Sequence, residues 1–158
     1  LQSVQMKRLY LFTLEITPLE VEKAYGELPS HLTLMSRFLS CLAPQELTAK
    51  VQPLFAQRAP IHMIFEETIS LGPKKVMAHM VRSPSEQRLH NDLRTLLDDA
   101  AVGYQYPEFI GERHRPHVTK REGLQFTLGS KHTASAAYLI EVVDEKRVVR
   151  VKFKFGLL

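Results

Sequence analysis

Hydrophobic and polar residues alternate along several segments of the chain, which predicts β-strands. Residues 8–17 (RLYLFTLEIT) are rich in aromatic and β-branched side chains and end before Pro18, and residues 31–38 (HLTLMSRF) have the same character. Four more segments predict two hairpins, with turns at Gly72-Pro73 and at Asp144-Glu145-Lys146. They are residues 61–72 with 74–82, and residues 135–144 with 147–157.

Apolar residues at helical spacing predict two long helices. Residues 83–101 combine an N-cap at Ser83 and a proline in the first turn with a leucine stripe at Leu89, Leu93, Leu96 and Leu97. Residues 43–57 carry a similar stripe and include Pro53, which predicts a kink. A third, short helix is predicted to begin at Pro18, with Glu20 and Glu22 near its N-terminus.

The order of these elements indicates an α+β fold with two similar lobes rather than a doubly wound parallel sheet. The length of 158 residues and the 44% hydrophobic content suit one globular domain over residues 1–158. We expect the lobes to share residues 6–158 and the first five residues to lie outside the fold.

Composition narrows the class of protein. The charged fraction of 24%, together with eight Phe and five Tyr, argues against disorder. No apolar run reaches the roughly 18 residues that a membrane span needs. A lone cysteine, Cys41, excludes an intramolecular disulfide and favours a reducing, cytoplasmic setting. The net charge of +4 favours an anionic ligand but falls short of a dedicated nucleic-acid binder.

The last predicted strand carries a basic row. Arg150, Lys152 and Lys154 share one face, and apolar residues share the other. We interpret the row first as a wet or edge face protected by charge. Contact with substrate phosphates is the alternative.

Two His-x-Thr motifs stand 86 positions apart, in HLTL and in HVTK. Residues two apart on a strand point to the same face, so His31 pairs with Thr33 and His117 with Thr119, while apolar neighbours face the other way. Polar side chains on a buried strand are costly unless they have partners or line a cavity. Two such strands side by side would line a cleft with two imidazoles and two hydroxyls.

This set of groups suits cleavage of a phosphodiester. A neutral imidazole accepts a proton from water or a ribose hydroxyl, while a protonated imidazole supplies one to the leaving oxygen. Threonine hydroxyls can donate to the non-bridging phosphate oxygens as negative charge develops. The chemistry therefore needs no metal or other cofactor.

The two motifs, with RLYLFTLEITP resembling an opening aromatic strand, are similar to those of the two-histidine (2H) phosphoesterase superfamily, which includes 2′-5′ RNA ligase-like proteins and cyclic nucleotide phosphodiesterases. The resemblance covers most of the chain. It implies a bilobal fold of two pseudo-symmetric antiparallel sheets with helices packed outside and a central cleft. It also implies metal-independent chemistry on RNA or nucleotide ends that carry a 2′,3′-cyclic phosphate or a 2′-5′ linkage.

On this resemblance, His31 and His117 are the acid and base, in either order, and Thr33 and Thr119 bind the phosphate. The second motif departs from the family pattern at Lys120, where an apolar residue is usual. Lys120 either points toward the substrate or marks an early strand end.

Further candidates flank the motifs. Phosphate contacts are assigned to residues beside or on the motif strands: Arg37, Arg113, Arg115 and Lys120. Stacking against a base is assigned to aromatic residues, which otherwise pack in the core or in loops: Phe12, Tyr104 and Tyr106.

Two other functions compete with the enzyme. A metal site would join His114, His117 and His31, with Glu108 and Glu112 nearby. A non-catalytic RNA-binding module would use the basic charge and the aromatic residues. The remaining histidines, His62, His79, His90 and His132, are interpreted as structural.

Overall fold

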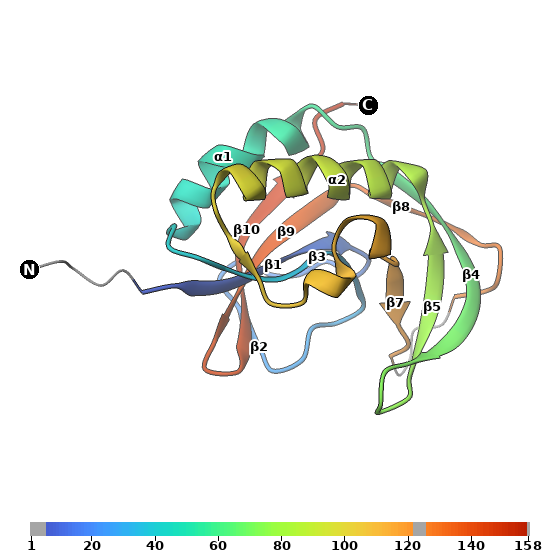
Figure 1. Ribbon diagram of the computed structural model, residues 1–158. Helices are drawn as coiled ribbons and strands as arrows, with labels where there is room; N and C mark the ends of the chain where they lie inside the picture. Colours follow the sequence, from blue (N-terminus) through green and yellow to red (C-terminus); the bar gives the residue numbers. More distant parts are fainter. Residues whose placement is uncertain (1–5, 122–125, 158) are drawn as a thin grey trace, which may run out of the picture.

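The computed structural model describes residues 6–121 and 126–157, so residues 1–5 and Glu122, the last residue of the HRPHVTKRE segment, lie outside the described residues. Within the described residues, ten strands join in one sheet, and every pairing among them is antiparallel (Figure 1). The strands are β1 (Arg8–Glu15), β2 (Ala24–Tyr25), β3 (His31–Ser40), β4 (Ile61–Leu71), β5 (Val76–Arg82), β6 (Gly103–Tyr104), β7 (His117–Thr119), β8 (Lys131–Ala134), β9 (Ala136–Val143) and β10 (Lys146–Lys154). The helices are α1 (Pro44–Ala56) and α2 (Pro84–Asp99), with the 3₁₀ turns η1 (Pro107–Phe109) and η2 (Gly111–Arg113).

The sheet has two arms. One arm runs β2-β10-β9-β1-β3 and the other runs β7-β5-β4-β8, with β6 added to β3. The arms meet where β3 pairs with β7 through Leu32 and Val118. The predicted α+β fold is confirmed. The two sheets expected from the sequence are joined, as the two arms of one continuous sheet.

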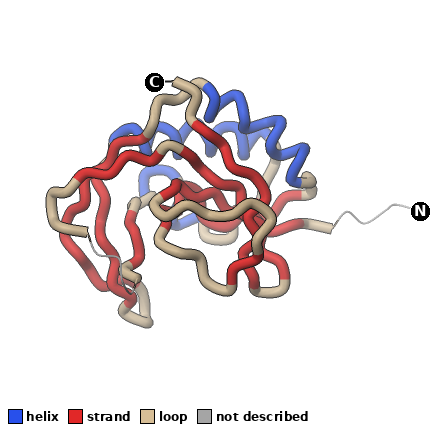
Figure 2. Tube along the Cα trace, turned by 180° about the vertical axis from the view of Figure 1, so that it is seen from behind, coloured by secondary structure: helices blue, strands red, loops and turns tan. Residues whose placement is uncertain are grey.

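Both helices cover the same side of the sheet, as Figures 1 and 2 show from opposite directions. Helix α1 contacts β10, and α2 contacts β3 and β4. Helix α2 begins as predicted, since the Glu86 amide donates to the Ser83 hydroxyl (3.3 Å). Helix α1 runs on through Pro53. Neither described helix is long and apolar enough to cross a membrane.

The main core lies between the helices and the sheet. Phe12 stacks against Phe38 (5.8 Å between centroids), and Phe55 of α1 stacks against Phe153 of β10 (4.7 Å). Leucines of α2 complete the layer, and each fully buried apolar side chain contributes about 1.5–3 kcal/mol. The apolar faces that the helical and strand periodicities predict pack against one another in this core.

The short helix predicted from Pro18 does not form. Leu19 is instead buried in a second, smaller cluster on the opposite face of the sheet. The backbone runs alongside β10, where the Glu22 amide donates to the Val149 carbonyl (2.6 Å) and Val149 donates back to Lys23 (3.1 Å). These contacts satisfy backbone hydrogen-bonding groups that a helix would otherwise pair. The segment then leads into β2.

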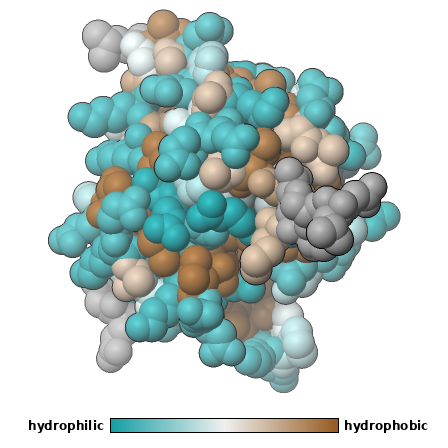
Figure 3. Space-filling model, turned by 90° about the vertical axis from the view of Figure 1, so that its left-hand side faces the viewer, coloured by the Kyte–Doolittle hydropathy of each residue, from teal (hydrophilic) through white to brown (hydrophobic). Residues whose placement is uncertain are grey.

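The predicted basic row does not lie on one face, because a bulge at Arg150, between Val149 and Val151, reverses the alternation of β10. Most of its charge is neutralised. Arg150 pairs with the buried carboxylate of Glu141 (2.9 Å), and Lys152 pairs with Glu15 (3.4 Å). The side of the molecule at the left of Figure 1 is mainly hydrophilic, with small hydrophobic areas between (Figure 3). The contacts favour the structural interpretation of this row over a phosphate-binding one.

Candidate active site

The two His-x-Thr motifs lie side by side at the junction of the arms. Because Leu32 is the antiparallel partner of Val118, His31 stands opposite Thr119 and Thr33 stands opposite His117. A local two-fold axis between Leu32 and Val118 therefore exchanges the two motifs. Opposite side chains have Cβ atoms about 5 Å apart, and the diagonal separation of the two histidines is about 7–8 Å.

The sheet separates this polar face from the core. Leu32 and Val118 are fully buried among apolar residues, whereas the motif histidines and threonines are partly exposed on the other face. The junction thus presents two imidazoles and two hydroxyls together, as expected from the alternation of the sequence.

Each histidine is held by the same local hydrogen bond. The Nδ1–H of His31 donates to the carbonyl oxygen of Pro29 (2.8 Å), and that of His117 donates to Arg115 (2.9 Å). A carbonyl can only accept, so Nδ1 carries the proton in both rings. Nε2 is left to accept a proton when the ring is neutral and to donate one when it is charged.

The surroundings of His31 favour its neutral form. Burial, first of all, lowers the pKa of His31, because it removes water from the imidazolium. The Pro29 carbonyl opposes this shift, and the positive charges of Arg121, His117 and Arg147 reinforce it. His31 is therefore suited to accept a proton near neutral pH.

A hollow of about 460 Å³ opens beside His31 and Thr119; we call it the basic hollow. Three arginines line it, Arg37 from β3, Arg121 just after β7 and Arg147 from β10, together with Glu27. Its charge is suited to anionic groups.

A second hollow of about 390 Å³ opens beside His117; we call it the apolar hollow. Met80, the antiparallel partner of His117, lines it with Leu71 and Phe109, and Arg113 and Arg115 add positive charge. Phe109 is 54% exposed, so its ring face is available to a ligand.

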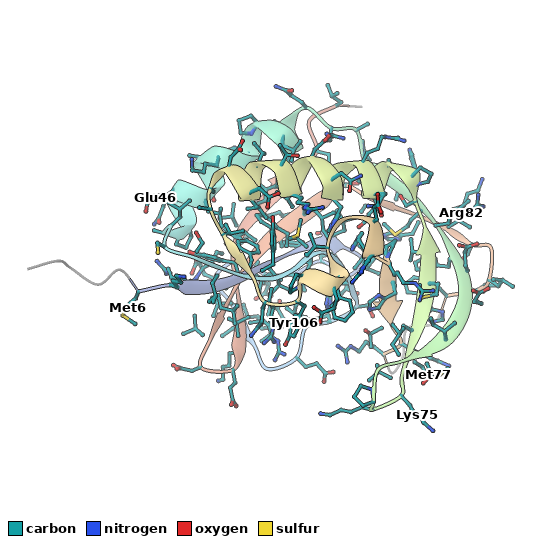
Figure 4. The ribbon with its side chains drawn as sticks, in the orientation of Figure 1. Met6, Glu46, Lys75, Met77, Arg82 and Tyr106 are labelled. Carbon is teal, nitrogen blue, oxygen red and sulfur yellow. The ribbon has the colours of Figure 1, made fainter. Side chains whose placement is uncertain are left out.

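Several predicted binding residues lie at these hollows. Arg37 lines the basic hollow, and Arg113 and Arg115 line the apolar one. Tyr106, labelled in Figure 4 on the segment between α2 and β7, lies 6.0 Å from Phe109 between ring centroids. Tyr104 instead bonds Asp98 of α2 (2.7 Å) and packs at the helix.

Two predicted binding residues do not lie at the site. Phe12 is fully buried in the aromatic core, so its ring cannot stack on a base. Lys120 follows Thr119 by one residue and so points to the other sheet face, where its charge acts on His79. The strand alternation that pairs His117 with Thr119 excludes Lys120 from the same face.

Three residues that line the hollows were not predicted from the sequence. Arg121 lies two residues after Thr119, so the alternation that selected the motif also places Arg121 on that face. Arg147 reaches the cleft from the distant β9–β10 hairpin, and Phe109 reaches it from a 3₁₀ turn. Neither position carries a local pattern that indicates a ligand.

The metal-site alternative is wrong in its geometry. His114 Nε2 bonds the buried Glu86 carboxylate (2.6 Å), and its ring stacks on His90 (3.9 Å between centroids), away from the motif face. Within residues 6–121 and 126–157, no group of three or more His, Cys, Asp or Glu side chains is arranged to hold a metal ion.

Comparison with solved structures identifies the fold. TT0787 of Thermus thermophilus is 17% identical, with 94% of this chain and 98% of that chain covered and a TM-score of 0.58. A structure described as a phosphoesterase is 12% identical, with 96% and 100% covered and a TM-score of 0.57. Escherichia coli LigT, in complexes with NADP⁺ and with 3′-AMP, is 11% identical, with 96% and 100% covered and a TM-score of 0.56.

No family model matches the chain, and no curated protein matches it in sequence. The coverage and TM-scores of the solved structures show that the chain shares their fold over nearly its whole length.

Proposed function

We propose that this protein is a metal-independent phosphodiesterase that acts on 2′,3′-cyclic phosphate or 2′-5′ linked ends of RNA or nucleotides, with His31 and His117 as base and acid. The proposal rests on one observation: the motifs are antiparallel partners whose histidines are held by the same Nδ1 hydrogen bond. The shared fold with a phosphoesterase and with LigT supports it.

The lowered pKa of His31 supports His31 as the base of the first proton transfer. His31 Nε2 takes a proton from water as the water oxygen attacks phosphorus. His117 Nε2–H gives its proton to the departing ribose oxygen as the phosphorus–oxygen bond breaks. One P–O bond forms and one breaks, and the two rings exchange protonation states, which solvent then restores.

Thr33 and Thr119 serve the phosphate in this scheme. Each stands opposite the histidine of the other motif, so the two hydroxyls flank the position between the imidazoles. Hydroxyl donors at that position stabilise the negative charge that builds on the non-bridging oxygens.

The apolar hollow is suited to the nucleoside. Phe109, Met80 and Leu71 offer surface for a base beside His117, and base–aromatic stacking contributes about 1–3 kcal/mol. Tyr106 adds to this surface, and Arg113 and Arg115, which line the same hollow, contact phosphate in this scheme. The complexes of LigT with 3′-AMP and NADP⁺ support a nucleotide ligand.

A panel of 2′,3′-cyclic nucleotides and 2′-5′ dinucleotides, incubated with the protein in EDTA, tests this function. We expect turnover of at least one member in EDTA, and a loss of about 10²–10⁴-fold in kcat for His31→Ala or His117→Ala. His62→Ala is the matched control, because His62 is exposed and bonded to Thr133 outside both hollows. The proposal fails if no member is turned over or if both histidine variants retain full activity.

A non-catalytic RNA-binding module remains the second candidate, favoured by the arginines of the basic hollow. It requires RNA binding that weakens steeply with salt and survives the combined His31→Ala and His117→Ala changes, with no turnover by the wild type.

A further inference from the structure

The basic hollow holds more positive charge than one phosphodiester requires. Its described lining has three guanidinium groups and one carboxylate, a surplus of two positive charges next to His31. The scissile phosphodiester carries a single negative charge and belongs between the motifs. A surplus of this size fits another anionic group beside it.

Arg147 forms no ion pair within the part of the chain that the structure describes. Its Nη1 donates to the carbonyl oxygens of Gly26 (2.6 Å) and Glu145 (3.2 Å), both neutral acceptors. These bonds tie the β9–β10 hairpin to the segment before β3 and fix the guanidinium at the rim of the hollow. A guanidinium has five N–H donors, so donors remain for a ligand.

Arg121 is also incompletely satisfied. It pairs with Glu27, whose side chain is 71% exposed, through one terminal nitrogen. Its Nε is buried and has no hydrogen-bond partner among residues 6–121 and 126–157. An unpaired buried donor is destabilising, and a hydrogen bond to an anionic ligand would remove that cost.

Both arginines lie near the reacting centre. Arg121 and Arg147 line the same hollow as His31, and their charges lower the pKa of its imidazole. Arg121 stands two residues beyond Thr119, on the same sheet face. The hollow therefore adjoins the phosphate position.

We propose that the basic hollow binds a second phosphate group of the substrate through Arg121 and Arg147. This inference rests on the proposed function, in which the scissile phosphate lies between His31 and His117. With the base in the apolar hollow on the other side, a phosphate on the 5′ oxygen of the same nucleotide reaches the basic hollow. The preferred substrates are 5′-phosphorylated nucleotides or RNA ends, and cyclic nucleotides with a free 5′ hydroxyl are poor ones.

Three substrates separate the sources of that phosphate. They are a 2′,3′-cyclic nucleotide with a free 5′ hydroxyl, the same nucleotide with a 5′ phosphate, and a dinucleotide that ends in the same cyclic nucleotide. We expect kcat/KM to be at least about 10-fold higher for one or both of the substrates with a second phosphate. A preference for the dinucleotide indicates RNA ends, and one for the 5′ phosphate indicates small nucleotides.

Variants connect the preference to the residues. The preference is the ratio of kcat/KM for the better substrate with a second phosphate to kcat/KM for the cyclic nucleotide with a free 5′ hydroxyl. Arg147→Gln and, independently, Arg121→Gln are expected to reduce this ratio toward one. Lys154→Gln, an exposed change on the same strand as Arg147, is expected to preserve the ratio. Far-ultraviolet circular dichroism and thermal unfolding verify that each variant is folded.

The outcomes distinguish the two claims. Equal turnover of all three substrates by the wild type, or an unchanged ratio in both folded arginine variants, overturns the second-phosphate subsite alone. Absence of turnover of every substrate overturns the proposed function, and this inference with it.

Discussion

His31 and His117 differ in their surroundings although their local hydrogen bonds match. Both rings donate Nδ1–H to the carbonyl two residues earlier. His31 lies next to three arginines and Glu27 in the basic hollow, whereas the hollow beside His117 combines two arginines with the apolar side chains of Met80, Leu71 and Phe109. The fold places equivalent imidazoles in unequal environments, which is a way to make one the base and the other the acid.

The pH dependence of kcat/KM tests this inequality. His31 must be neutral to accept a proton, so activity falls as pH drops through its pKa. Because that pKa is lowered, the midpoint of the acidic limb is expected below the ordinary histidine value of about 6.5.

Arg121→Gln removes one of the charges that lower the pKa, so the midpoint is expected to move upward. Lys154→Gln serves as a charge-matched control and is expected to leave the midpoint in place. A limb at or above 6.5 in the wild type contradicts the assignment of His31.

At the scale of elements, His90 of α2 joins three segments around the site. Its Nδ1–H donates to the Leu34 carbonyl of β3 (2.7 Å), and its Nε2 accepts from the Gly111 amide of η2 (2.9 Å). His90 is fully buried, and its ring stacks on His114, three residues before His117. It therefore holds the segments that carry both motifs against α2.

Acid is expected to weaken this connection. Burial, and then the charge of His114, lowers the pKa of His90 to about 4, so the folded state resists a proton that the unfolded chain accepts near 6.5. Stability is lost as pH falls from about 6.5 toward 4, by up to about 3 kcal/mol from this group. Chemical unfolding as a function of pH measures the loss.

His90→Gln should remove that part of the pH dependence, because an amide does not titrate in this range. His62→Gln, at an exposed position, should keep it. An identical pH dependence in the wild type and His90→Gln would show that His90 does not oppose protonation in the folded state.

Most of the helices and longer strands were predictable from the sequence. The leucine stripe of α2 and the two hairpins follow from local periodicity, and both were predicted within a few residues of their bounds. The strands β2, β6 and β8 were missed, and His132 was expected in a loop, because the pairing of these short segments depends on distant partners and not on a pattern of their own. The Pro18 segment was misjudged because its contacts with β10 are tertiary.

At the scale of the whole molecule, the cleft arises from how the arms meet. The sequence predicted that His31 shares a face with Thr33 and that His117 shares a face with Thr119, since alternation alone decides each of these pairings. It did not contain the register of Leu32 with Val118, nor the approach of Arg147 from the far end of the chain. Those depend on the packing of both arms under two helices, a fold that the chain shares with LigT.

The central claim is that the two imidazoles act together on one phosphate, and a double-mutant cycle tests it most directly. For a substrate that the wild type turns over, kcat is measured for His31→Ala, His117→Ala and the double variant. We expect each single change to cost about 10²–10⁴-fold and the double change to cost little more than either, since residues that act as a unit are not additive. Losses that multiply in the double variant, or activity that survives either single change, would contradict it.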